Sequence, residues 1–193
     1  ELEPRYKEYI KNVIDARITI SLETATFLQV FCEGFRPRSV LDLGSGFSSF
    51  VFRSYAERQG NVEVVSVDDH PEWLKKTRAY LQECGVSDAN LHLWSDFSSG
   101  KKGHFDLVFH DLGNLQTRRD ALPFVIDSAF PRKGVVVLDD IHKTGYWLYF
   151  NQIVPRYFDY RFLSGKPFTL DKFGRFAGLI VDVDRNKIPI MRL

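Results

Sequence analysis

The sequence predicts an α/β protein built on a doubly wound, Rossmann-like sheet of seven strands, mostly parallel, with helices on both faces. Three observations predict this fold. Short runs rich in β-branched residues alternate with segments of helical period, several of these runs are apolar at successive positions, and two further strand-like segments close the chain. Alternating strands and helices are typical of parallel sheets, and strands that are covered on both faces read as continuous apolar runs.

The parallel part of the sheet is predicted from five short apolar segments. They are SVLDLG (39–44), VEVVSVD (62–68), NLHLWSD (90–96), FDLVFHD (105–111) and GVVVLDD (134–140). Apolar residues recur at helical spacing between most of them, in SSFVFRSYAERQ (48–59), PEWLKKTRAYLQECG (71–85) and TRRDALPFVIDSAF (117–130).

Two helices and an antiparallel hairpin frame this core. Before it, residues 5–16 and 21–35 have helical patterns, and Ser21 is a plausible N-cap of the second helix. After it, residues 160–170 and 175–185 read as two strands joined through DKFG, a turn that contains a glycine. We therefore expect one domain over residues 1–193, in which 1–35 form N-terminal helices that could supply a lid and 36–193 form the cofactor-binding core.

Composition indicates an ordinary soluble globular protein. The 193 residues carry a net charge of +1, so no excess of basic charge predicts a nucleic-acid partner. No segment reaches the roughly 18 to 20 consecutive apolar residues of a membrane span, and no signal-peptide pattern opens the sequence. Cys32 and Cys84 have neither disulfide nor metal spacing, which favours buried thiols in a reducing, cytoplasmic compartment. The pattern leaves the oligomeric state open.

A loop of small residues, Gly44-Ser45-Gly46-Phe47-Ser48-Ser49, follows the first predicted strand. Ligands of open α/β sheets bind beyond the carboxyl ends of the strands, and glycine allows a backbone to approach them closely. The following helix presents free N–H groups, with Ser48 and Ser49 as capping candidates. The loop by itself is equally compatible with a tight turn that binds nothing.

The second predicted strand ends in Asp68 and Asp69, which strengthens the interpretation of the loop as a ligand site. Asp68 lies 22 positions beyond Gly46, close to the roughly 20-residue offset at which a carboxylate receives the hydroxyls of a ribose. The two aspartates also suit a simpler role, as caps of the helix that starts at Pro71.

Two departures from a dinucleotide motif favour a positively charged nucleoside over NAD. Ser48-Ser49-Phe50 stands where a dinucleotide loop has its third glycine. Asp42, two positions before Gly44, would repel a pyrophosphate but could hold an ammonium group.

These segments together resemble the class I S-adenosylmethionine-dependent methyltransferases over roughly residues 36–185. VLDLGSGFSS looks like the first motif of that family, and VSVDDHPEWLKKTRAYL looks like its second strand and helix, with Asp68 at the ribose position. LHLWSDF resembles the third-strand segment, which implies that Asp96 and the Phe97 backbone flank the adenine. The resemblance implies S-adenosylmethionine as cofactor, held also by Asp42, Gly44, Ser45, Gly46, Ser48, Ser49, Asp69 and Asp111.

Three aspartates end the fourth and fifth predicted strands. Asp111, Asp139 and Asp140 can converge at one edge of the sheet, and oxygen clusters of this kind suit Mg²⁺. They also match the positions of acidic residues in small-molecule O-methyltransferases of the catechol and caffeoyl-CoA type. A metal there would bind the acceptor hydroxyl and lower its pKa. The alternative is that these aspartates orient the substrate or cap loops without a metal.

The catalytic base is less clear from the sequence. The catechol-type enzymes carry a lysine three positions after the fourth-strand aspartate, where this chain has Asn114. His142 and Lys143, just beyond the acidic pair, are the nearest replacements, beside Asp111 itself. His110 should point to the opposite face of the sheet from Asp111, in a structural role.

An aromatic segment, IHKTGYWLYF (141–150), follows the fifth predicted strand. Tyr146 and Trp147 could form a wall of the substrate site, or the segment could be a helix that packs Trp147 and Phe150 into the core.

The sequence predicts a methyltransferase that transfers a methyl group from S-adenosylmethionine to a small acceptor, most simply a hydroxyl, with possible assistance from Mg²⁺. A nucleoside-binding module without catalysis and, more weakly, an NAD-dependent oxidoreductase are the alternatives.

Overall fold

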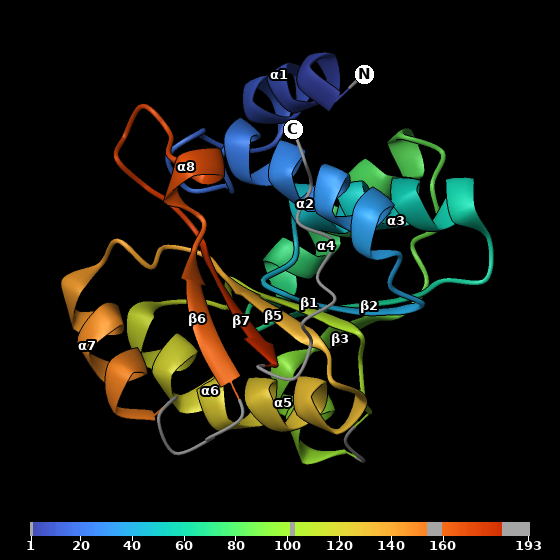
Figure 1. The fold of residues 1–193 in the computed structure, drawn as a ribbon. Helices are drawn as coiled ribbons and strands as arrows, with labels where there is room; N and C mark the ends of the chain where they lie inside the picture. The colour runs from blue at the N-terminus through green and yellow to red at the C-terminus, as the bar shows by residue number, and fades with distance from the viewer. Residues whose placement is uncertain (1, 101–102, 154–159, 183–193) are drawn as a thin grey trace.

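A seven-stranded sheet between two layers of helices forms the protein (Figure 1). The computed structural model describes residues 2–100, 103–153 and 160–182. The strand order is β3-β2-β1-β4-β5-β7-β6, and β7 runs antiparallel to both of its neighbours. All other neighbouring strands pair in parallel. The order reverses between β1 and β4, where ligands of such sheets bind.

The strands are short and the helices mostly longer than two turns. The strands are β1 (Ser39–Leu43), β2 (Glu63–Asp68), β3 (Leu91–Leu93), β4 (Leu107–His110), β5 (Val135–Leu138), β6 (Tyr160–Ser164) and β7 (Gly178–Asp182). The helices are α1 (Leu2–Asn12), α2 (Leu22–Phe35), α3 (Phe47–Gln59), α4 (Pro71–Glu83), α5 (Trp94–Ser99), α6 (Leu115–Ala129), α7 (Thr144–Ile153) and α8 (Lys166–Thr169), with a 3₁₀ turn at Phe130–Arg132.

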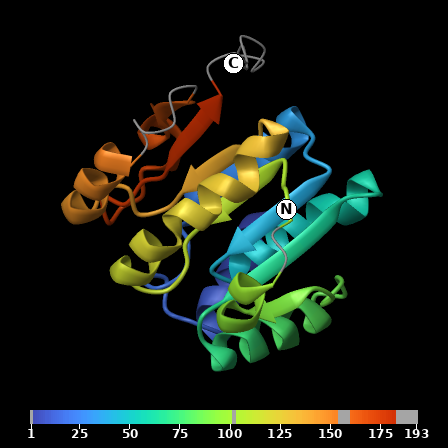
Figure 2. The same ribbon diagram turned by 90° about the horizontal axis from the view of Figure 1, so that it is seen from below.

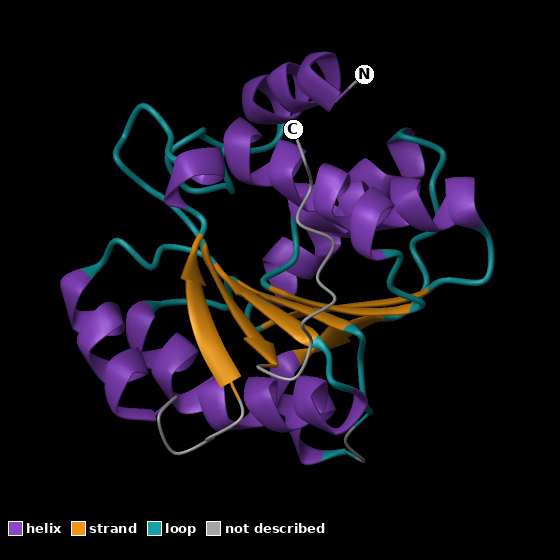
Figure 3. Cartoon of the chain, in the orientation of Figure 1, coloured by secondary structure: helices purple, strands orange, loops and turns teal. Residues whose placement is uncertain are grey.

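Apolar side chains on both faces of the central strands explain the two helical layers. Along β1, Val40 joins the core beneath α1–α4, whereas Leu41 and Leu43 join the core against α6 and α7. Figure 2 shows α5, α6 and α7 in front of the sheet, and Figure 3 shows the helices above and below it. Each central strand therefore buries both faces, as its continuous apolar sequence predicts.

The five predicted parallel strands are confirmed, with one correction. The third is much shorter than residues 90–96, because the chain turns into helix α5 directly after Leu93. Of the two N-terminal helices, the first ends at Asn12 instead of residue 16, and Ser21 caps the second by accepting a hydrogen bond from the Thr24 N–H at 3.0 Å.

The terminal antiparallel pair is confirmed, but its connection differs from the predicted turn. The first strand ends at Ser164, and the short helix α8 lies between it and a tight turn at Asp171–Gly174. Within the described ranges, no helix has the length and apolar character needed to cross a membrane.

Candidate active site

Two adjoining cavities lie beyond the carboxyl ends of the parallel strands. The first, of about 230 Å³, is lined by the loop after β1, by the ends of β2 and β4, and by the segment between α1 and α2. Of the predicted cofactor residues, it collects Gly44, Ser45, Gly46, Ser48, Asp68, Asp69 and Asp111. We call it the cofactor cavity.

The packing of the protein backbone, independent of any ligand, requires a glycine at position 44. A Cβ on Gly44 would lie 2.5 Å from the carbonyl oxygen of Asp111, and the residue has a φ of +102°. The two backbones are held this close because the Asp111 N–H donates to the Leu43 carbonyl at 2.6 Å. The glycine therefore lets the ends of β1 and β4 meet beneath the cofactor cavity.

Asp42 does not face the cofactor cavity, which corrects its predicted role near an ammonium group. Its side chain is fully buried and accepts hydrogen bonds from the hydroxyls of Ser48, Ser49 and Ser66. Ser49 in turn accepts a hydrogen bond from the Gly46 N–H at 3.2 Å. Burial raises the pKa of Asp42, against the opposing effect of the three hydroxyls. Asp42 thus holds the loop after β1 in place from the protein interior, on the side away from the cofactor cavity.

Asp68 lines the cofactor cavity and is hydrogen-bonded to the loop after β1. One oxygen accepts from the N–H and the hydroxyl of Ser45, at 2.9 and 3.0 Å, and the other accepts from the His70 N–H at 2.9 Å. Burial raises its pKa to about 6 in spite of these hydrogen bonds. Asp69 is more exposed, and Gly113 makes room for it, since a Cβ there would lie 2.2 Å from an Asp69 oxygen.

The N-terminal segment covers the cofactor cavity, and sequence reasoning identified none of its individual residues. Tyr9, Ile14, Ile18, Thr19 and Ile20 line the cavity from above. His70 and Trp73 also line it, from α4 and the residue before it. The only sequence signal was the position of two helices ahead of the core, which suggested a lid without naming its contacts.

A second cavity, of about 340 Å³, lies beside the first at the ends of β4 and β5. The two share Ile18, Thr19, Asp111, Gly113 and Arg118 as lining residues. The second adds residues from the segment between α1 and α2, from the segment that joins β5 to α7 and from the connection to β7, namely Arg17, Asp139, Asp140, Lys143 and Arg175. We call it the acceptor cavity.

Arg118 of helix α6 occupies the centre of the acidic cluster. Its guanidinium forms ion pairs with Asp111 and with Asp140, the latter at 2.8 Å. Lys143 forms a further ion pair with Asp140. Burial acts to raise the pKa of Asp140, but Arg118 and Lys143 outweigh it and hold the pKa below its usual value.

These partners do not suit a metal ion. The predicted metal ligands Asp111 and Asp140 already pair with the guanidinium of Arg118, and Asp140 also pairs with the ammonium of Lys143. These two cationic groups take the place that a metal ion would have beside the carboxylates. Within residues 2–100, 103–153 and 160–182, no group of three or more acidic, histidine or cysteine side chains has a geometry that could hold a metal. Arg118 carried no motif in the sequence, and only its placement on the first turns of α6 brings it here.

Asp139 is the third member of the cluster and is placed differently. It is buried and lines the acceptor cavity, and among the described residues it forms no ion pair within 4.0 Å. Burial, followed by the neighbouring carboxylate of Asp140, raises the pKa of Asp139 to about 6.

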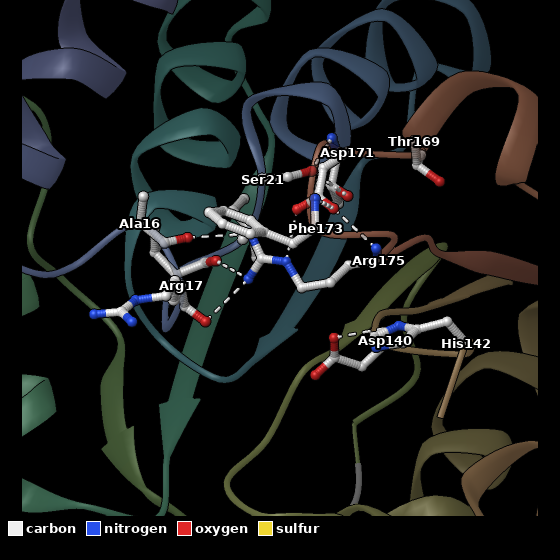
Figure 4. Close-up of polar contacts among 12 residues, drawn as sticks. Ala16, Arg17, Ser21, Asp140, His142, Thr169, Asp171, Phe173 and Arg175 are labelled. Atoms are coloured by element: carbon white, nitrogen blue, oxygen red, sulfur yellow. Dashed lines mark hydrogen bonds and ion pairs between the residues drawn. The ribbon is translucent and has the colours of Figure 1, made fainter. Parts of the chain in front are cut away.

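Arg175 fastens the N-terminal segment over both cavities (Figure 4). Its guanidinium donates hydrogen bonds to the carbonyl oxygens of Ala16 at 3.1 Å, Arg17 at 3.2 Å and Thr19 at 3.0 Å. The buried Asp171 holds the Arg175 side chain at 2.7 Å and also accepts from the Arg175 N–H. We call residues 16–19 the roof segment.

The predicted bases lie at the edge of the acceptor cavity. Lys143 lines it, whereas His142 lies behind Asp140, with Nδ1 at 3.7 Å from a carboxylate oxygen and its ring against Phe176. Burial lowers the pKa of His142. Asn114, at the position of the family lysine, caps α6 by accepting from the Gln116 and Thr117 N–H groups.

His110 is buried on the α6 side of the sheet. Its Nε2 lies 3.0 Å from the Arg118 carbonyl oxygen, and burial lowers its pKa to about 4. This placement agrees with a structural role.

The predicted aromatic wall is absent from the described lining of both cavities. Tyr146 is fully buried and lies near His110, and Trp147 packs against Phe150 and Phe162. Helix packing accounts for both side chains.

Asp96 and Phe97 are also placed away from the cofactor cavity. Both belong to α5, where Asp96 is exposed and Phe97 packs against Phe124. The reason is the early end of β3, which turns this segment into a helix.

Comparison with known proteins places the fold among methyltransferases. No family model and no curated protein matches the sequence. Among solved structures, an O-methyltransferase of tomaymycin synthesis from Streptomyces achromogenes, in complex with SAM, matches with a TM-score of 0.70 and 15% identity, over 94% of this chain and 88% of that one. An O-methyltransferase from Bacillus cereus, in complex with SAH, matches with a TM-score of 0.69 and 14% identity, over 94% and 90% of the two chains.

A third match is the SAH-bound methyltransferase PaMTH1 from Podospora anserina. It has a TM-score of 0.68 and 16% identity, over 94% of this chain and 87% of that one. At these identities the comparison establishes the fold, and the chain therefore has the seven-stranded α/β fold of these S-adenosylmethionine-binding methyltransferases, as the sequence predicts.

Proposed function

We propose that this protein is an S-adenosylmethionine-dependent methyltransferase that acts on a hydroxyl group of a small molecule. The observation that carries the proposal is the pair of adjoining cavities at the switch in strand order, one with the features of a nucleoside site and one lined by polar groups. Structures that share the fold were solved with SAM or SAH bound, which supports the choice of cofactor.

The cofactor cavity suits S-adenosylmethionine. The loop Gly44–Ser48 presents the N-terminus of α3, Asp68 offers carboxylate oxygens for a ribose, and Asp69 lies beside it at the cavity edge. Asp111 adds negative charge where a cationic ligand is favoured, although Arg118 neutralises part of it. When bound, the cofactor would supply an electrophilic methyl group on a positively charged sulfur.

The work of the chain in such a reaction is to place the acceptor hydroxyl and to exclude water. The roof segment closes both cavities from one side, so the acceptor would be enclosed beside the cofactor. Arg118 keeps Asp111 and Asp140 in fixed positions by its ion pairs with both. Because its guanidinium lies between these two predicted metal ligands, the proposed reaction does not use a metal ion.

We infer that Asp139 receives the hydroxyl proton. Lys143 forms an ion pair with Asp140, Arg118 forms one with Asp111, and His142 is absent from the described lining of the acceptor cavity. Asp139 lines that cavity and forms no ion pair within 4.0 Å among the described residues, so a hydroxyl can approach it. The predicted roles of His142 and Lys143 then become those of neighbours that hold Asp140 in place.

Calorimetric titration with SAH, paired with a methyl-transfer assay, tests the proposal. We expect SAH to bind the wild type, Asp68→Ala to weaken binding by at least tenfold, and Asp139→Asn to bind SAH normally. Failure of the wild type to bind SAH or S-adenosylmethionine would refute the proposed function. Normal binding without turnover on a broad panel of hydroxyl acceptors would favour the nucleoside-binding module.

A further inference from the structure

The acceptor cavity has walls that are polar and charged. The described lining consists of Arg17, Ile18, Thr19, Asp111, Gly113, Arg118, Asp139, Asp140, Lys143 and Arg175. Not one of these described lining residues is aromatic. A planar aromatic acceptor would find no ring to stack on and would have to desolvate charged groups without replacing their hydrogen bonds.

The two aromatic residues that were predicted to form a wall of the substrate site are engaged elsewhere. Tyr146 has no exposed surface, and the Trp147 ring packs edge-to-face against Phe162 at 5.0 Å between centroids. Neither ring belongs to the described lining of the acceptor cavity.

The wall carries charges of both signs, and ion pairs hold several of them in place. The lining holds four cationic side chains, Arg17, Arg118, Lys143 and Arg175, and three carboxylates, Asp111, Asp139 and Asp140. Arg118 is fixed between two carboxylates, and Arg175 is fixed by Asp171 and by the roof segment. Hydrogen-bond donors and acceptors therefore stand side by side in the wall of the acceptor cavity.

We infer that the methyl acceptor is a polyhydroxylated, non-aromatic molecule of the carbohydrate or cyclic polyol class. Each hydroxyl of such a molecule is both a donor and an acceptor, so neighbouring hydroxyls pair with alternating carboxylate and cationic groups. A cavity of about 340 Å³ falls at the small end of the usual range for ligand sites. This inference names the substrate class of the acceptor cavity and rests on the proposed function for the reaction itself.

The test compares probes that differ in aromaticity while the cofactor cavity is filled. The protein is saturated with SAH, and binding of methyl α-D-glucopyranoside, cis-1,2-cyclohexanediol and catechol is followed by NMR titration. The last two probes carry the same pair of adjacent hydroxyls on an aliphatic and an aromatic ring. We expect the glucopyranoside to bind most tightly and catechol most weakly.

Two matched variants test whether the glucopyranoside binds in the acceptor cavity. Lys143→Gln changes an exposed lining cation, and Lys172→Gln makes the same change on the turn before Arg175, outside the described lining. We expect Lys143→Gln to weaken glucopyranoside binding by about tenfold, the effect of losing one hydrogen bond to a charged group, and Lys172→Gln to leave it unchanged.

Each outcome bears on one claim. Catechol binding more tightly than the glucopyranoside, no detectable glucopyranoside binding up to its solubility limit, or equal effects of the two variants would overturn the inference. In all three cases SAH binding stands and so does the proposed cofactor. Absence of SAH binding instead overturns the proposed function.

Discussion

Replacing Gly44 with alanine tests the physical basis of the cofactor cavity. The added Cβ would meet backbone atoms of Asp111 at 2.5 and 2.6 Å, and the φ of +102° is unfavourable for any residue with a side chain. The backbone conformation costs about 1–2 kcal/mol, and forcing apart two packed segments typically adds about 1–3 kcal/mol. We therefore expect Gly44→Ala to lower the free energy of unfolding by about 2–5 kcal/mol.

Alanine substitutions at two other glycines separate the cost of the backbone conformation from the cost of the steric clash in a urea-unfolding assay. Gly85 has a φ of +71°, and a Cβ added there would have nothing within 4 Å, so Gly85→Ala carries only the backbone cost of about 1–2 kcal/mol. Gly34 lies in α2 with open space around it, so Gly34→Ala should stabilise the protein by up to about 1 kcal/mol. A Gly44→Ala variant that is no more destabilised than Gly85→Ala, at equal denaturant dependence, would contradict a clash between Gly44 and the Asp111 backbone.

Three further perturbations follow from the site. Because burial raises the pKa of Asp68 to about 6, its acceptor form is lost as pH falls through that value. SAH affinity measured by calorimetry should be constant above about pH 7 and fall by up to tenfold per unit below about pH 6; an unchanged profile in Asp68→Asn would speak against this assignment. Asp42→Asn should cost about 1–3 kcal/mol in thermal unfolding, since an amide NH₂ group, which cannot accept, replaces one of the two carboxylate oxygens that accept from the three serine hydroxyls, and no change would contradict the buried network. Methyl transfer should be insensitive to EDTA, and Mn²⁺ titration by EPR should detect no bound ion, because Arg118 pairs with the carboxylates; stoichiometric Mn²⁺ binding that disappears in Asp140→Asn would reverse this conclusion.

Local sequence patterns predicted those features of the fold and the site that are determined by residues close together in the sequence. The strands β1, β2, β4 and β5, the glycine loop and Asp68 at the end of β2 were all readable from periodicity and spacing. The convergence of Asp111, Asp139 and Asp140 also followed, because the carboxyl ends of parallel strands meet at one edge.

The missed features depend on pairing between distant segments. Asp42 looked like a ligand residue because its three hydroxyl partners, one of them on β2, cannot be assigned from the sequence. Arg118 is one of several arginines on helices, and its position between two carboxylates appears only when α6 packs beside β4 and β5. The end of β3 at Leu93 was hidden because the apolar pattern of residues 90–96 fits a strand or a short helix.

The Arg175 contacts also bear on the order in which the protein assembles. They join residues 156 to 159 positions apart, close to the full span of the described chain. Contacts of such high sequence separation form late, because the intervening chain must first be ordered. During synthesis, strands β1 to β5 can build an open cofactor cavity while the roof segment still lacks its anchor. The protein would thus become competent to enclose an acceptor only after the β6–β7 region has been made, which ties completion of the site to completion of the sheet.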